Sequence, residues 1–284
     1  MLAKNYKREE MDQMKDLPNI KIPFFNEGQL YLTDRDTVVK RISNLNGNYF
    51  SNKLYTIHSL ENKRNVINME ELALPTNLVS INKEVVGYEM PYIHGVTLDD
   101  YLKDESVDVK DKIKALQNAG DILRKMQKVR DTGAIDDFFL NDLHEKNFIV
   151  TPEGQLKVVD LDSCSISSNL KFGTKYVSSM TPVKYYPKYE RITTRSCGAE
   201  FIPSVETDLY CYNIMILNFL SGDRMHLYSA ENYMEYLNYL EQIGANKELL
   251  DNLSRVYSDR PNVNVDYLLE SIEEIQGKSR CRSK

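Results

Sequence analysis

The segment LNDLHEKN at residues 140–147, followed by VVDLD at residues 158–162, is the most informative part of the chain. Apolar runs stand beside these polar residues, FIV at 148–150 and LKVV at 156–159. Between the runs, PEG at 152–154 favours a tight turn. The sequence therefore predicts a two-stranded hairpin, whose ends would bring together a carboxylate, an amide and a second carboxylate.

Three side chains near this hairpin are candidate site residues: Asp142, Asn147 and Asp160. Each one alone is equally typical of a turn or a helix cap, because short polar side chains bond to nearby backbone groups. For all three together, beside neighbouring strands, an explanation by turns and caps alone is much weaker.

The region before this hairpin has the pattern of a small antiparallel sheet. From residue 20 to residue 93, short apolar or β-branched runs alternate with turn residues. One helix interrupts them, because Phe50, Leu54, Ile57 and Glu61 are spaced four, three and four residues apart and share one face. The expected strands are residues 20–25, 29–33, 37–42, 78–81 and 85–90.

Beyond Gly95 the apolar spacing becomes helical. Thr97 followed by Asp100 resembles a capping box, and a longer helix begins at Val109 and stops near Gly133. Residues 229–243, 247–257 and 265–275 are patterned as further helices. The fold class expected from these elements is α+β, with the strands concentrated in the first third of the chain.

Composition limits the possible functions. The chain has 284 residues, 42% of them hydrophobic and 27% charged, which is typical of a globular protein. Its formal net charge of −6 does not favour nucleic acid or an anionic membrane as a partner. Four widely spaced cysteines form neither a zinc pattern nor a disulfide framework, so we expect a cytoplasmic protein.

The spacing of the candidate residues resembles that of the protein kinase-like family. There, a catalytic-loop Asp precedes an Asn by five positions, and a metal-binding Asp follows the Asn by thirteen, as Asp142, Asn147 and Asp160 do here. The resemblance implies ATP and Mg²⁺ as cofactors, Asp142 as the base or hydroxyl-orienting residue, and Asn147 and Asp160 as magnesium ligands. It also implies a two-lobed fold with a small antiparallel sheet in the first lobe and a mainly helical second lobe.

The same resemblance assigns roles in the expected sheet. Lys40, which ends the run VVK, would contact the α- and β-phosphates, and Gly28 would lie in the loop that covers them. Glu61 on the expected helix would pair with Lys40, with Glu70 and Glu71 as rival candidates.

A second set of positions matches the connection between the two lobes. MPYIHG at residues 90–95 resembles the hinge, where Met90 precedes the adenine contacts made by the carbonyl of Pro91 and the backbone of Ile93. A plain strand end explains this segment as economically. Asp208 would bond to the backbone of the catalytic loop or would simply be a helix N-terminal acid.

The implied domain organisation follows from the hinge. It consists of an N-terminal extension at residues 1–19, a nucleotide-binding lobe at 20–93, a helical lobe at 94–276 with the catalytic loop and activation segment, and a basic tail at 277–284.

The chain also departs from the family pattern. The phosphate-covering loop has a single glycine, and Leu140 and Asn141 replace the usual His-Arg pair. His144 stands where Ser/Thr kinases carry a Lys, and a neutral imidazole stabilises developing phosphate charge less than an ammonium does. Asp162 replaces the glycine of the metal motif and would either help to hold the metal or cap the next turn.

Three functional hypotheses follow. The long segment between Asp160 and Asp208 favours a Ser/Thr protein kinase with a protein hydroxyl as its acceptor. The loop DLHEKN is also similar to that of aminoglycoside and choline kinases, which favours a small-molecule acceptor. The poor glycine loop and the missing His-Arg pair favour a catalytically inactive scaffold.

Overall fold

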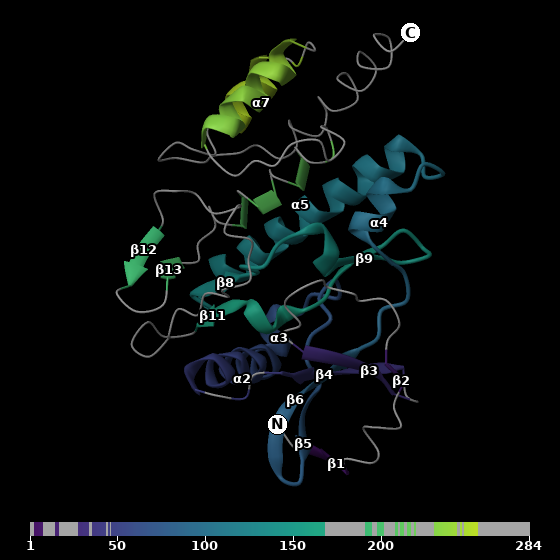
Figure 1. Ribbon diagram of the computed structural model, residues 1–284, viewed down its shortest axis with the longest axis vertical. Helices are drawn as coiled ribbons and strands as arrows, with labels where there is room; N and C mark the ends of the chain where they lie inside the picture. Colours follow the sequence, from purple (N-terminus) through teal and green to yellow (C-terminus); the bar gives the residue numbers. More distant parts are fainter. Residues whose placement is uncertain are drawn as a thin grey trace. The chain divides into compact units, whose positions relative to one another are not determined.

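Figure 1 shows the computed structural model of the chain. It divides into two compact units, each described by itself below. The first unit comprises Met1–Gly95, Met126–Leu140 and Lys157–Tyr176, and the second comprises Val96–Lys125, Asn141–Leu156 and Val177–Lys284. The structure describes residues 3–7, 15–16, 28–33, 36–43, 45, 47–167, 191–194, 198–201, 208–209, 211–212, 215–216, 219, 230–242, 245 and 247–254.

A six-stranded sheet forms the centre of the first unit, in the order β1-β5-β6-β4-β3-β2. All neighbouring strands are antiparallel except β1 and β5, which run parallel. Four predicted strands are confirmed, and the one at residues 20–25 lies outside the described residues. The strands are β1 (Ala3–Tyr6), β2 (Lys15–Asp16), β3 (Gly28–Leu32), β4 (Thr37–Ile42), β5 (Asn77–Ile81) and β6 (Glu84–Pro91).

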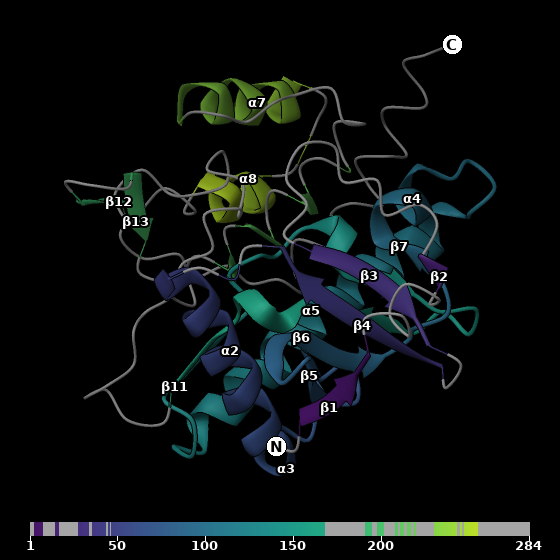
Figure 2. The same cartoon turned by 60° about the horizontal axis from the view of Figure 1, so that its bottom comes forward.

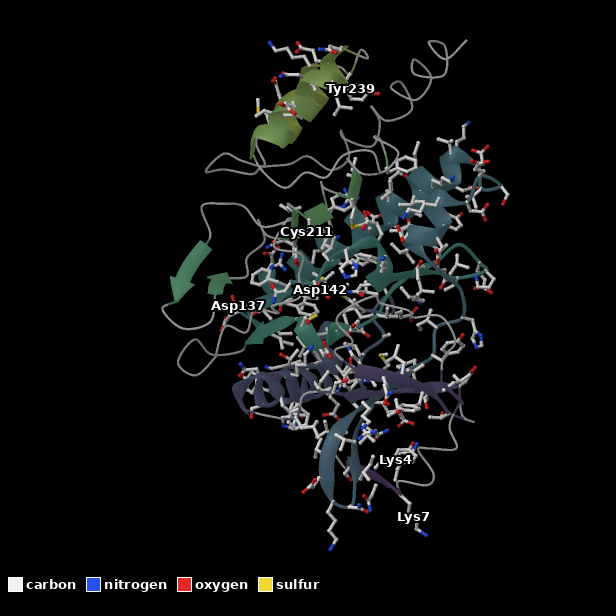
Figure 3. All side chains as sticks on the ribbon, viewed as in Figure 1. Lys4, Lys7, Asp137, Asp142, Cys211 and Tyr239 are labelled. Atoms are coloured by element: carbon white, nitrogen blue, oxygen red, sulfur yellow. The ribbon has the colours of Figure 1, made fainter. Side chains whose placement is uncertain are left out.

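Two strands come from residues 1–19, which the sequence suggested to be an extension. β1 pairs with β5 at one edge of the sheet and β2 pairs with β3 at the other. The run AKNY of β1 lacks the apolar alternation that predicts a strand, so its pairing depends on the partner strand. Lys4, labelled in Figure 3, also ties β1 to the sheet, because its Nζ donates to Glu89 Oε1 on β6 over 2.8 Å.

The carboxylate of Glu89 is a buried anchor for three strands. Besides Lys4 on β1, it accepts hydrogen bonds from Thr37 Oγ1 on β4 and Asn77 Nδ2 on β5, each at 2.8 Å. Burial by itself would raise the pKa of Glu89, but the bonds from Lys4, Thr37 and Asn77 outweigh it and hold the pKa below its usual value.

The helix α2 (Gly47–Asn62) covers one face of this sheet, and it confirms the helix predicted at residues 48–61 (Figures 1 and 2). Ile57 of α2 packs on Val38 of β4, together with residues of β6. Side chains alternate along a strand, so Lys40 lies on the same face of β4 as Val38, the face toward α2. Val39 points to the opposite face and packs with Tyr31, Val79 and Val86.

The remaining elements of the first unit bring a later segment of the chain to this sheet and helix. Val158 forms backbone hydrogen bonds to the residues on both sides of Leu72. Its N–H donates to the carbonyl of Glu71 at 2.7 Å, and its carbonyl accepts the N–H of Ala73 at 2.9 Å. These bonds hold the end of β10 (Leu156–Val158) beside residues 71–73. The 3₁₀ turn η2 (Leu161–Ser163) follows shortly after β10. The other elements are α3 (Arg64–Ile67) and the antiparallel pair β8 (Asp137–Phe139) and β11 (Ser165–Ser167).

In the second unit, β7 (Val96–Thr97) pairs antiparallel with β9 (Phe148–Val150). The predicted cap is confirmed, since Thr97 Oγ1 accepts the N–H of Asp100 at 3.1 Å at the start of α4 (Leu98–Lys103). The predicted long helix is α5 (Val109–Asp131), of which residues 109–125 belong to this unit and the rest to the first. After its end, Gly133 has a φ of 70°, a backbone angle that favours glycine. The other elements are η1 (Glu145–Asn147), β12 (Arg191–Thr194), β13 (Gly198–Phe201), α7 (Ala230–Gln242) and α8 (Lys247–Ser254).

These elements confirm the α+β class, with a small, mostly antiparallel sheet and several helices. α7 and α8 agree with two of the predicted later helices, whereas the helix predicted at 265–275 lies outside the described residues. Within the part of the chain that the structure describes, no helix combines the length and the apolar character required to cross a bilayer.

Candidate functional site

Four charged side chains of the first unit form what we call the lysine–aspartate cluster. Lys40 on β4 forms ion pairs with Asp160 Oδ1 and, at 3.0 Å, with Asp162 Oδ2. Lys53 on α2 binds the other oxygen of Asp162, Oδ1, at 2.6 Å. Two positive and two negative charges therefore lie together, which compensates each of them for lost solvation.

The backbone geometry of Asp160 helps to form this cluster. Asp160 has φ 59° and ψ 53°, the left-handed region, in which residues other than glycine are uncommon. The chain therefore turns sharply after β10, and Asp160 and Asp162 both reach Lys40. We infer that these ion pairs compensate the strain of the left-handed residue.

Solvent exposure distinguishes the two aspartates. The side chains of Asp162 and Lys53 are 0% exposed and that of Lys40 is 6% exposed, whereas the side chain of Asp160 is 29% exposed. Asp160 is thus the carboxylate of the cluster that a ligand from solution can reach.

The two carboxylates also differ in proton affinity. Burial raises the pKa of Asp160 to about 6; the charge of Asp162 adds to this effect and Lys40 opposes it. Burial acts in the same direction on Asp162, but Lys40 and Lys53 outweigh it and hold the pKa of Asp162 well below its usual value. Asp162 therefore stays ionised when Asp160 takes up a proton.

The expected pairing of Lys40 with Glu61 is replaced by a different arrangement. The side chain that α2 contributes to the cluster is Lys53, and the carboxylates that pair with Lys40 come from the segment after β10. Glu61 is a partly exposed residue near the end of α2. The sequence reasoning missed Lys53, although its spacing to Ile57 and Leu60 places a lysine on the buried face of the helix.

In the second unit, the loop at residues 141–147 is held by its own hydrogen bonds. The amide Nδ2 of Asn147 donates to the carbonyl of Asp142 at 2.9 Å and to its carboxylate Oδ2 at 3.1 Å. The N–H of Asn147 also bonds to the carbonyl of His144 at 3.0 Å. Asp142, labelled in Figure 3, is therefore fixed by Asn147 five positions later.

His144 lies beside the Asp142 carboxylate, with 3.6 Å between Nε2 and Oδ2. Its other ring nitrogen, Nδ1, accepts the N–H of Lys146 at 3.2 Å. A nitrogen that accepts carries no hydrogen, so we assign the ring hydrogen of the neutral imidazole to Nε2, the nitrogen next to Asp142.

The expected bond between Asp208 and this loop is confirmed. Asp208 Oδ1 accepts the backbone N–H of Asn141 at 3.0 Å, and both residues are buried. Asn141 has a φ of 61°, a left-handed angle that Asn adopts more easily than most residues. The bond therefore holds the backbone directly before Asp142.

The other candidate residues lie in or next to the six-stranded sheet. Gly28 opens β3 opposite Ile42, so close to the carbonyl of Arg41 that a Cβ atom would clash. Strand packing thus explains this glycine without a bound phosphate. At the end of β6, Met90 is buried, whereas Pro91 and Ile93 are partly exposed.

Each unit, taken by itself, holds an oxygen donor of a kind that Mg²⁺ accepts. Asp160 offers a reachable carboxylate, and Asn147 offers an amide oxygen because its nitrogen is used by Asp142. Mg²⁺ is usually bound by one or two such oxygens together with phosphates and water. No group of three or more His, Cys, Asp or Glu suited to a metal ion is found among the residues that the structure describes.

A scan of the chain against models of known protein families matches none of them, and a search of curated proteins finds no match. The functional interpretation therefore depends on the residues above, their contacts and their chemistry.

Proposed function

We propose that the chain is an ATP- and Mg²⁺-dependent phosphotransferase with a two-lobed, protein kinase-like fold, and that it acts as a Ser/Thr protein kinase. The observation that carries the proposal is the ion pair between Lys40 on β4 and Asp160 after β10, 120 positions apart. The resemblance to the protein kinase-like family assigns both residues to the same triphosphate. A lysine beside a partly exposed carboxylate suits a site for phosphate and a cation.

In this proposal, each group of the chain has a separate task. The ammonium of Lys40 would bind phosphate oxygens, and Asp160 and Asn147 would be the residues that hold Mg²⁺. When bound, Mg²⁺ neutralises negative charge on the phosphate oxygens. Asp142 orients the acceptor hydroxyl and takes its proton as the new oxygen–phosphorus bond forms, while the bond between the γ-phosphorus and the bridging oxygen breaks and ADP leaves.

The hydrogen bonds of the loop support this role for Asp142. Asn147 and Asp208 fix the carboxylate and the backbone before it, so little freedom is lost when a hydroxyl approaches. His144 adds an N–H donor beside the carboxylate, and we propose that it binds the incoming acceptor or a phosphate oxygen.

The acceptor class separates the two enzymatic alternatives. The length of the segment between Asp160 and Asp208 favours a protein hydroxyl. The position of His144 next to Asp142, in a loop similar to that of aminoglycoside and choline kinases, is the observation that favours a small hydroxylated acceptor.

The test is transfer from γ-labelled ATP with Mg²⁺ to casein, compared with ADP release in the presence of aminoglycosides or choline. We expect Asp142→Asn to lower transfer by about 10²–10⁴-fold. The matched control is Asp121→Asn, which changes an exposed carboxylate paired with Arg124 on α5 and should leave transfer unchanged.

Each possible outcome has a defined meaning. Equal transfer by the wild type and the Asp142→Asn variant would contradict the role of Asp142. Transfer only to a small acceptor would contradict the protein kinase and favour the small-molecule kinase. A rise in melting temperature with ATP and Mg²⁺, without transfer to any acceptor, would indicate the inactive scaffold.

A further inference from the structure

The buried pair of Lys53 and Asp162 has no place in the mechanism above. Both side chains are completely buried, and the pair joins α2 to η2, 109 positions apart. A buried lysine is costly unless its charge is compensated, so this pair is unlike an ordinary surface ion pair. Neither solvation of a surface charge nor capping of a nearby turn explains why Lys53 and Asp162 are buried together.

Two simpler roles for Asp162 do not agree with its contacts. A cap would place it at the start of η2, but the N-cap position belongs to Asp160, and Asp162 lies within the turn. A direct metal ligand needs an oxygen open to the ion, but one oxygen of Asp162 binds Lys53 at 2.6 Å and the other binds Lys40 at 3.0 Å.

We propose that Asp162 is a positioning residue that holds Lys40 for phosphate binding, and that Lys53 makes this depend on the position of α2. The proposal rests on the proposed phosphotransferase function. The resemblance implies that the helix supplies a carboxylate to Lys40. Here the helix supplies a cation, and the carboxylate comes from the segment that also carries Asp160.

This arrangement has a regulatory consequence. While Lys53 binds one oxygen of Asp162, the charge of that carboxylate is shared between two lysines. If α2 moved away, Asp162 would attract Lys40 more strongly, because its buried charge would then be shared with one lysine instead of two. Lys40 would then be held back from phosphate, so a partner that displaces α2 would lower activity.

The experiment combines Lys53→Met, Asp162→Asn and the double variant, which keeps the net charge of the cluster unchanged. Each single change leaves a buried charge unbalanced and should lower the melting temperature, and the double variant should recover most of that loss. The kcat of the double variant should nevertheless stay about 10- to 100-fold below wild type, because Lys40 has lost its positioning carboxylate.

The matched control is Lys103→Met with Asp99→Asn, the same two changes at a partly exposed pair in α4, with 2.8 Å between Lys103 Nζ and Asp99 Oδ1. It should leave kcat, KM for ATP and melting temperature unchanged. If the Lys53→Met/Asp162→Asn variant recovers kcat together with stability, the pair is only structural and the proposal is overturned. If the Lys53→Met/Asp162→Asn variant fails to fold, the proposal is also overturned, because the charges of Lys53 and Asp162 then do not balance each other.

Failure of the underlying function gives a different result. A wild-type chain that neither transfers phosphate nor binds a fluorescent ATP analogue contradicts the phosphotransferase itself and the positioning role with it. An active wild type with an equally active double variant contradicts only the positioning role.

Discussion

The lysine–aspartate cluster and the loop at residues 141–147 fix their functional side chains in opposite ways. The cluster joins four charges from β4, α2 and the segment after β10, which are far apart in the chain. The loop is held by hydrogen bonds among its own residues and by the bond from Asn141 to Asp208. The cluster therefore depends on charge balance in a buried place, whereas the loop depends on backbone geometry.

The largest expected effect is on the cluster. Lys53→Met removes one partner of a fully buried pair, so the free energy of unfolding should fall by about 3–5 kcal/mol. Urea denaturation measures this change. Lys103→Met, at an exposed pair, should cost less than about 1 kcal/mol in the same assay. Similar losses for both variants would show that the cluster does not depend on charge balance.

A smaller effect is expected for the loop. Asp208→Ala leaves the buried N–H of Asn141 without its acceptor, which should cost about 1–3 kcal/mol of unfolding free energy. Asp208→Asn keeps an oxygen at the same place and should cost less. Urea denaturation gives the energies, and hydrogen exchange at the Asn141 amide should be faster in the Ala variant. Unchanged exchange there would argue against the bond.

The smallest expected effect is the pH dependence that Asp160 confers on stability. Its pKa is about 6 in the folded chain and about 4 when unfolded, so between these values the folded state binds more protons, and stability falls as the pH rises. Asp162 acts oppositely, since its lowered pKa contributes stability that is lost only as the pH falls below about 4.

We therefore expect Asp160→Asn to remove part of this loss. The difference in free energy of unfolding, variant minus wild type, should be about 1–2 kcal/mol more positive at pH 7 than at pH 4. Urea denaturation without Mg²⁺ measures it at both pH values. Parallel curves for the two chains across this range would contradict the raised pKa of Asp160.

Features that depend on local order were predicted well from the sequence. β4, α2 and the cap at Thr97 agree with the local spacing of their residues, whereas the bond from Asn141 to Asp208 was expected from the resemblance alone. Local propensity and periodicity act over a few residues, and they determined these elements without knowledge of the fold.

Features that depend on distant partners and have no counterpart in the resemblance were not predicted. Lys53 looked like one charged residue of a helix, because its carboxylate stands 109 positions later. Asp162 looked like a turn residue for the same reason. The strands β1 and β2 have too little apolar alternation to be recognised, and they exist because strands already in the sheet offer free hydrogen-bonding groups.

The pairing of β1 has a consequence for how molecules of this protein behave toward one another. β1 occupies the outer side of β5, where backbone N–H and C=O groups would otherwise face the solvent. Exposed edges of this kind recruit strands from other molecules and lead to aggregation. The tetrapeptide Ala3–Tyr6, with Lys4 bound to Glu89, thus covers this edge of β5, and we expect a chain trimmed of it to be prone to self-association through β5.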